Sequence, residues 1–310
     1  MPSLFQRSSL TFGEAKIWVA EQHSKQASTE MLNRAGRAIQ RAVKDWNRYK
    51  WEWLITSGTD VSVTAGLNNT KYPVPYNYRD MYSLVITQGG VSRALVQDTK
   101  RVYDRVMPKP MTSMTSAYNL VRLGDLGKFE LQDPPNADGT VRMLYYRRMN
   151  IPCSVTGATV TAYSVASGAD AARLYLSSTA GIQIGAPISV VISSTEKLAE
   201  GTVVTAVEAD YVEISSDPLA APTPAGAVTV GGDNEFLDIH VDFEWDLLAR
   251  AVEHFLVSCG AAEAKLAYWI QAAVNGIEKA QAAQNDKDDR DLSFEVMPAY
   301  AGYNPNRIVE

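Results

Sequence analysis

Cysteine and histidine are scarce in this chain. Its 310 residues include two cysteines, Cys153 and Cys259, and three histidines, His23, His240 and His254. Two cysteines far apart in the sequence exclude both a disulfide framework and a cysteine-rich zinc site, and assembly in a reducing, cytosolic compartment is expected. The histidines share no helical spacing. We expect His254, which lies in an apolar helical stripe, to be a packing residue rather than a ligand.

The sequence motifs of common enzymes are missing as well. The chain has no glycine-rich phosphate loop, no G-x-S-x-G elbow and no H-E-x-x-H motif. We therefore expect no catalytic residues, no cofactor and no metal ion. No stretch approaches the roughly 18 apolar residues that a membrane helix needs. The first residues lack the basic region and apolar run of a signal peptide, so we expect a protein that is neither secreted nor bound to a membrane.

Positive charge is not in excess. The chain contains 29 basic and 35 acidic side chains, a formal net charge of −6. Because affinity for phosphate comes mainly from clustered lysine and arginine, this balance argues against general nucleic-acid binding. Any DNA that the protein meets is expected to slide past without sequence-specific binding.

Helical periodicity dominates residues 9–55. Apolar residues recur there with a period close to 3.6, and a polar stretch at residues 24–29 predicts two helices instead of one. Opposite the apolar stripe, basic side chains recur every three or four residues. We call the following five the basic stripe: Arg34, Arg37, Arg41, Lys44 and Arg48. It is either an ordinary solvated face, an interface to an acidic neighbour, or a patch beside passing DNA.

Strand patterns follow, in two segments of different composition. Residues 60–148 contain short alternating runs separated by turn residues such as Gly89-Gly90. A short helix is expected at residues 100–106. In residues 151–232, lysine and arginine nearly vanish and short β-branched runs recur, at residues 188–192, 202–207 and 211–214. This composition predicts a self-contained small β domain.

The chain then returns to helix and ends without periodicity. Apolar residues at helical spacing run from Leu247 to Leu256 and resume from Ala264 to Ile277. The last residues carry Pro298 and Pro305 and are expected to be extended. We therefore predict an α+β fold: a helical bundle packed with an antiparallel β-sheet, an inserted all-β small domain and an extended C-terminal arm. The predicted domains are a discontinuous core (1–150 and 233–291), the insertion (151–232) and the arm (292–310).

Aromatic residues are concentrated in residues 43–54, Val-Lys-Asp-Trp-Asn-Arg-Tyr-Lys-Trp-Glu-Trp-Leu. This segment resembles the aromatic end of the first core helix in the family of head-to-tail adaptor proteins of short-tailed bacteriophages. Residues 72–79 and 129–135, and the strand through Tyr145-Tyr146, are similar to its later strand motifs. The resemblance covers about residues 9–150 and 233–291. Residues 151–232 are a departure, because many members lack them.

The resemblance implies a connector of the tail tubular protein A or gatekeeper type. Such a protein is a closed ring, commonly of twelve copies, between the portal protein and the tail nozzle protein, with genomic DNA passing through it. It is a virion component of the head-tail junction, assembled in the host cytoplasm. We expect contacts to the portal, the nozzle or a second copy at the basic stripe and the arm, through Phe294, Tyr300, Tyr303 and Ile308.

Two other functions remain open. The β domain is a candidate receptor- or glycan-binding module, with Tyr163, Tyr175 and Tyr211 as stacking residues. The alternative is a metal-dependent hydrolase, because carboxylates cluster around His240 and oxygen clusters bind divalent cations. Acids that favour a helix start are the simpler explanation of this cluster. Its members are Asp233, Asp238, His240, Asp242, Glu244 and Asp246.

Overall fold

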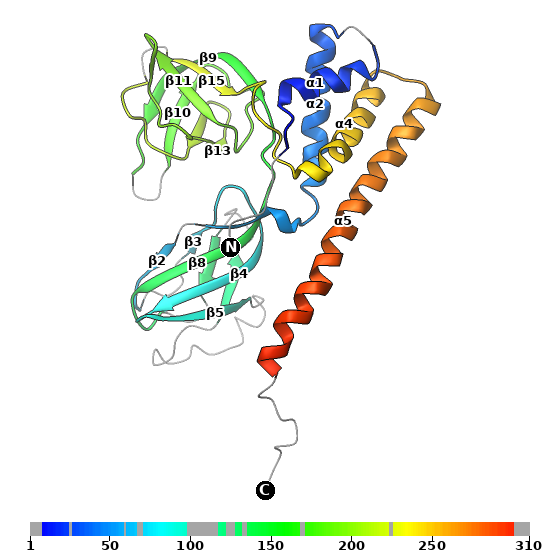
Figure 1. Cartoon of the computed structure of the whole chain (residues 1–310). Coiled ribbons are helices and arrows are strands. Elements are labelled where there is room, and N and C mark those ends of the chain that lie inside the picture. Colours follow the sequence, from blue (N-terminus) through cyan, green and yellow to red (C-terminus); the bar gives the residue numbers. More distant parts are fainter. Residues whose placement is uncertain are drawn as a thin grey trace. The chain divides into compact units, whose positions relative to one another are not determined.

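The chain folds into two compact units of different composition. A computed structural model describes residues 8–24, 27–58, 60–66, 71–97, 117–121, 128–131, 135–167, 171–222 and 226–300 (Figure 1). Contacts divide the chain into one unit of Met1–Gly13 with Asn47–Asp238 and another of Glu14–Trp46 with Ile239–Glu310. The first unit holds two β-sheets and the second holds the helices. The α+β class with antiparallel sheet is thus confirmed, and the predicted domain boundaries stay a prediction.

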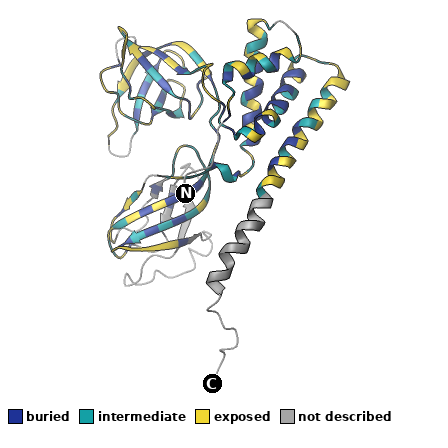
Figure 2. Ribbon diagram, in the orientation of Figure 1, coloured by how far each residue is buried: buried dark blue, intermediate teal, exposed yellow. Residues whose placement is uncertain are grey.

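Three longer helices build the helical unit, together with the shorter α1 (Phe12–Glu21). They are α2 (Thr29–Trp46), α4 (Glu244–Ser258) and α5 (Glu263–Tyr300). The predicted break between the first two helices is therefore confirmed. Helix α2 packs on α4, and α4 packs on α5. The apolar faces form the buried interior (Figure 2), with Ile39, Val43 and Trp46 on α2 and Leu248, Val252 and Phe255 on α4 all nearly inaccessible.

The prediction of an extended arm is wrong for residues 292–300, because α5 continues to Tyr300. Residues 277–290 are rich in alanine, glutamine, glutamate, lysine and arginine, which are strong helix formers. Extending an existing helix also avoids the cost of nucleation, because each added residue gains one hydrogen bond. Of the predicted contact residues, Phe294 and Tyr300 belong to this helix. Tyr303 and Ile308 lie outside the described residues.

The first β-sheet occupies residues 55–147. Its strands pair in the order β1-β8-β4-β5-β6-β7-β3, and β2 also pairs with β8. Gly89 and Gly90, with φ of 55° and 79°, form the hairpin turn between β4 and β5. The helix expected at residues 100–106 lies outside the described residues. The strands are β1 (Ile55–Ser57), β2 (Val61–Val63), β3 (Lys71–Pro73), β4 (Tyr78–Gln88), β5 (Val91–Gln97), β6 (Ala117–Val121), β7 (Lys128–Leu131) and β8 (Gly139–Arg147).

The second sheet closes on itself and forms a small β-barrel. Its strands pair in the order β12-β11-β15-β9-β10-β14-β13. An antiparallel bridge from Pro187 to Val203 and a 3.0 Å hydrogen bond from Ile188 N to Thr202 O then join the β11 side to the β13 side. Closure of this kind removes free sheet edges. The strands are β9 (Ser154–Ser164), β10 (Ala172–Leu176), β11 (Ile188–Ile192), β12 (Thr195–Glu196), β13 (Val204–Val207), β14 (Tyr211–Ile214) and β15 (Ala227–Gly231).

The β-barrel has a core of its own, drawn only from residues between Cys153 and Val230. Its two ends lie side by side, because β15 pairs with β9 and Gly232 N donates to Cys153 O at 2.9 Å. The flanking segments are also joined. Asp238 accepts hydrogen bonds from Arg147 Nη2 and Asn150 N, each at 2.8 Å. Neighbouring ends are what a domain inserted into another chain segment requires. The insertion itself stays a prediction.

Gly231 permits the close approach of the two ends, and replacing it tests the arrangement. Its φ is +64°, and an added Cβ would lie 2.0 Å from Cys153 O. We expect Gly231→Ala to lower the free energy of unfolding by about 3 kcal/mol, through steric overlap and backbone strain. Gly201→Ala is the matched control, because its φ is +80° but no atom lies within 4 Å of the added Cβ. It should cost about 1 kcal/mol in denaturant unfolding, and equal losses would contradict the prediction.

Candidate interface on the helical unit

The exposed face of α2 carries most of the basic stripe. Arg37, Arg41 and Lys44 are exposed, at spacings of four and three residues that place them on one side of the helix. None of these three has an acidic partner within the part of the chain that the structure describes. Arg34 differs, because it pairs with Glu30 at 2.6 Å. The stripe thus presents three uncompensated positive charges to solvent.

Arg48 is placed differently from the other four basic residues. Helix α2 ends at Trp46, and Arg48 lies in the turn that follows, within the first unit. Its backbone carbonyl accepts a hydrogen bond from Arg79. The structure therefore brings together Arg34, Arg37, Arg41 and Lys44 on α2, and leaves Arg48 outside that face.

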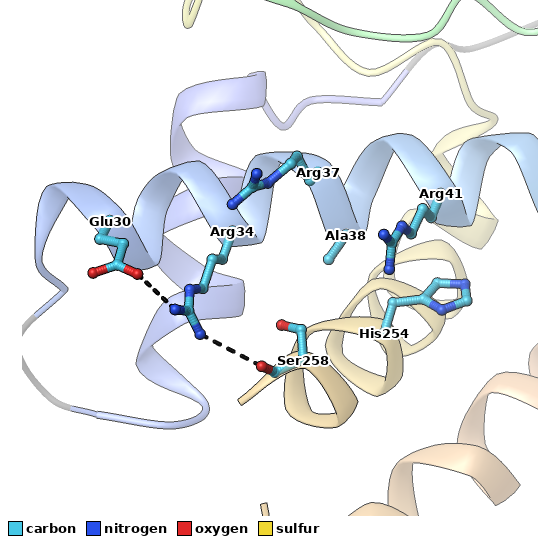
Figure 3. A pocket seen from close by; sticks show the side chains of 7 residues that line it. All are labelled: Glu30, Arg34, Arg37, Ala38, Arg41, His254 and Ser258. Carbon is cyan, nitrogen blue, oxygen red and sulfur yellow. Dashed lines mark hydrogen bonds and ion pairs between the residues drawn. The ribbon is translucent and has the colours of Figure 1, made fainter. Parts of the chain in front are cut away.

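A shallow hollow of about 380 Å³ lies between the stripe and α4. Figure 3 shows Arg34 reaching from α2 to Glu30 and to the backbone oxygen of Ser258, the latter at 3.4 Å. That contact places a positive charge at the C-terminal end of α4, where the helix dipole favours it. Three arginines against one glutamate give the hollow a positive lining. Its lining residues are Glu30, Arg34, Arg37, Ala38, Arg41, His254 and Ser258.

A network of charged side chains joins α2 to α4 beside the hollow. Asp45 Oδ2 accepts hydrogen bonds from Arg250 Nε and lies against His254 Nε2, both at 2.9 Å. Arg250 also bonds Glu253 at 2.6 Å. Burial by itself would raise the pKa of Asp45, but the hydrogen bonds from His254 and Arg250 outweigh burial and lower it below 3.8. His254 is thus a satisfied packing residue, as predicted.

Aromatic side chains from three helices lie together, a grouping that the sequence did not indicate. Trp18 on α1 packs edge-on against Trp245 of α4 and Trp269 of α5, with ring centroids 5.3 and 6.0 Å apart. Trp245 is 52% exposed and Tyr268 is 66% exposed. Trp and Tyr are enriched at protein interfaces. The only sequence signal was the presence of these aromatics on otherwise alanine-rich or polar helices, and their proximity depends on helix packing.

The acidic cluster proposed as a metal site is not brought together. Asp238 is held by Arg147, and Asp246 pairs with Lys279 at 3.3 Å. Asp233 and Asp238 belong to the first unit, whereas residues 239–246 belong to the second. Among the described residues, no three histidine, cysteine or carboxylate side chains are grouped to hold a metal ion.

The three tyrosines of the β-barrel do not form one stacking platform. Tyr175 and Tyr211 are cross-strand partners with ring centroids 5.5 Å apart, and Arg173 lies over the Tyr211 ring at 5.1 Å. Tyr163 is instead the partner of buried Leu174, which places it on the opposite sheet face. The guanidinium of Arg173 is already paired with Glu213.

No helix in the described part of the chain has both the length and the apolar character to span a membrane.

The Asp45 network predicts a pH-dependent contribution to stability. Asp45→Asn should lower the free energy of unfolding by about 2 kcal/mol at pH 7, because charge-assisted hydrogen bonds are lost. Since the pKa of Asp45 is lowered in the folded state, its contribution is present above the ordinary pKa of aspartate and is lost as pH falls through the lowered pKa of the folded state. The difference from wild type should therefore shrink towards pH 3 in denaturant unfolding. Glu278→Gln, at an exposed position on α5, is the control, and a pH-independent difference would contradict the assignment.

Comparison with known protein families gives one match. The family model described as SU10 adaptor protein matches residues 12–180, which is more than half of the chain. The match spans α1, α2 and the first sheet and continues through β10 of the β-barrel. It thus includes residues 151–180, which lie between the two segments (9–150 and 233–291) that the resemblance noted in the sequence covers. A search of the curated proteins finds no match.

Proposed function

Because the chain belongs to the SU10 adaptor protein family, we propose that it forms a ring that joins the portal to the tail nozzle of a bacteriophage. The family is one of structural adaptors, so a virion component is the coarse function. The finer proposal is a ring of about twelve copies at the head-tail junction, assembled in the host cytoplasm, with the genome passing through its lumen. A ring requires two different complementary faces on each copy.

The observation that carries the proposal is the set of three exposed basic residues of the stripe that have no acidic partner on α2 or elsewhere in the described ranges. Like charges three or four residues apart on a helix destabilise it slightly, so this spacing adds nothing to the stability of α2 itself. Here Arg37, Arg41 and Lys44 point away from the buried helix interior and have no acidic partner among the described residues. A face of this kind fits an acidic protein partner. The exposed Trp245 and Tyr268 supply apolar area of the type that anchors interfaces.

The length of α5 gives a second support. Helix α4 has 15 residues and α5 has 38, which correspond to about 22 and 57 Å. Lys279 of α5 already reaches Asp246 near the start of α4, so the later part of α5 extends past it (Figure 1). A single helix has little stability by itself in water. We propose that residues 292–310 contact the portal or the nozzle.

Charge is consistent with a conduit that does not grip DNA. A net charge of −6 repels phosphate at long range, and strong phosphate binding would oppose the passage of the genome. The lumen is therefore proposed to guide DNA without base contacts. No cofactor or metal takes part in this function.

Electron microscopy with and without a candidate portal tests the proposal. We expect closed rings on the portal. The obligate interface between neighbouring copies in such a ring usually buries more than about 2,000 Å² in total. A monomer under both conditions would contradict the proposed ring.

Removal of residues 292–310 tests the portal contact separately. The truncated chain should keep its thermal unfolding transition, since the helices and sheets described above lie before residue 292 except for the end of α5. Its affinity for the portal should fall at least tenfold in pull-down or interferometry. Unchanged affinity would remove these residues from the interface.

A further inference from the structure

Positive and negative charge are segregated along the chain. Residues 151–232, which contain the whole β-barrel, have seven acidic and two basic side chains, a net charge of −5 out of −6 for the entire chain. Residues 29–50, which contain α2, have six basic and two acidic side chains, a net charge of +4. A single protein thus carries two strongly charged surfaces of opposite sign. A heterologous contact joins two different surfaces of identical copies, and surfaces of opposite charge are suited to such a contact.

The basic stripe itself restricts the kind of partner. Its side of α2 is formed by charged and amide side chains, with the apolar residues of the helix buried on the other side. An apolar surface would leave Arg37 and Arg41 desolvated without a partner, which is costly. An acidic polar surface would provide partners for both arginines and would thus avoid this desolvation cost. At four residues apart, Arg37 and Arg41 are about 6 Å apart along the helix axis.

The β-barrel offers a matching acidic surface. A hollow of about 320 Å³ beside β11 and β12 is lined by Glu196, Glu200 and Glu235, together with Ser189 and Thr229. Glu196 is held in place, because its Oε1 accepts from Val190 N at 2.8 Å and Leu198 N at 3.1 Å. Glu200 and Glu235 are exposed. Neither has a basic partner within the described ranges.

We propose that the basic stripe of one copy docks against this acidic hollow on the β-barrel of the next copy. The inference rests on the proposed ring and names the surfaces that set its subunit order. Each exposed ion pair contributes little affinity, because solvent and salt screen its charges. The charges therefore determine the register and specificity of the contact, while apolar area such as that of Trp245 provides most of the affinity. This role gives the β-barrel a function in assembly.

Two charge-reversed variants of the full chain test the contact. Arg37→Glu/Arg41→Glu makes the stripe acidic, and Glu200→Lys/Glu235→Lys makes the hollow basic. Each variant alone would place like charges in every contact, so we expect ring assembly to weaken at least tenfold. Assembly is measured by sedimentation and electron microscopy, free or on the portal, under the condition in which the wild-type chain closes rings.

An equimolar mixture of the two variants is the decisive measurement. In an alternating ring of even number, every contact then joins opposite charges: glutamate stripe to lysine hollow, and arginine stripe to glutamate hollow. We expect the mixture to assemble although neither variant does so alone. Rising salt should weaken wild-type and mixed rings alike, because the Debye length falls below about 10 Å above 0.1 M.

The control variant is Glu208→Lys/Asp210→Lys. Both residues are exposed acids of the β-barrel in the turn between β13 and β14, outside the hollow. This variant changes the net charge as much as Glu200→Lys/Glu235→Lys does, and it should assemble like wild type. Failure of the control to assemble would show an effect of net charge alone and overturn the proposal.

The other outcomes are also decisive. Unchanged rings from either variant would overturn the contact while leaving the ring itself intact. A mixture that fails to assemble would assign the stripe to the portal, the nozzle or the β-barrel of its own copy. Loss of duplex DNA binding by Arg37→Glu/Arg41→Glu, with normal rings, would assign the stripe to DNA. Absence of rings from the wild-type chain would overturn the proposed function and this inference together.

Discussion

The helical unit depends on the burial of one face of α2 against α4. Ile39, Val43 and Trp46 leave water completely or nearly so, and burial of such side chains is the dominant favourable contribution to folding. Because the α-helix repeats every 3.6 residues, fixing this face inward fixes the opposite face outward. The exposure of Arg37, Arg41 and Lys44 is thus a consequence of core packing. No further interaction is therefore needed to orient the charged surface that we propose for assembly.

Ion pairs with hydrogen bonds hold segments that are remote in the sequence. Asp45 binds Arg250 and His254 between α2 and α4, and Asp238 binds Arg147 beside the ends of the β-barrel. Both carboxylates are largely buried, with side-chain exposures of 14% and 8%. A buried carboxylate without its partners would be strongly unfavourable. These interactions therefore specify one arrangement of each pair of segments, in addition to any stability that they contribute.

The β-barrel shows how an acidic module can be carried without disturbing the rest of the chain. Its core contains residues 153–230 alone, and its strands close through the Pro187–Val203 bridge. A closed sheet exposes no free edge to neighbouring copies, so unwanted strand addition is suppressed. Contact through side-chain charge remains possible on its outer surface. In the ring that we propose, this combination would favour one specific contact over general aggregation.

Sequence periodicity identified α1, α2, α4 and the first part of α5, with the break before α2, and some of the strands, among them β11, β13 and β14. It was wrong about residues 292–300, because the prolines were given more weight than the helix-forming residues before them. It also missed the grouping of Trp18, Trp245 and Trp269, since no local pattern relates residues on three separate helices. The acidic residues near His240 looked like one cluster in the sequence, but the structure assigns them to separate units and partners.

The sequence by itself determined the α+β class, the family resemblance, the segregation of charge and the solvent-facing side of α2. These properties follow from local composition and from the helical period. Only the tertiary structure decided which charges are compensated, that the barrel strands close, and that Glu200 and Glu235 line one hollow. Compensation and closure depend on contacts between residues distant in the chain, and a local pattern carries no information about such distances.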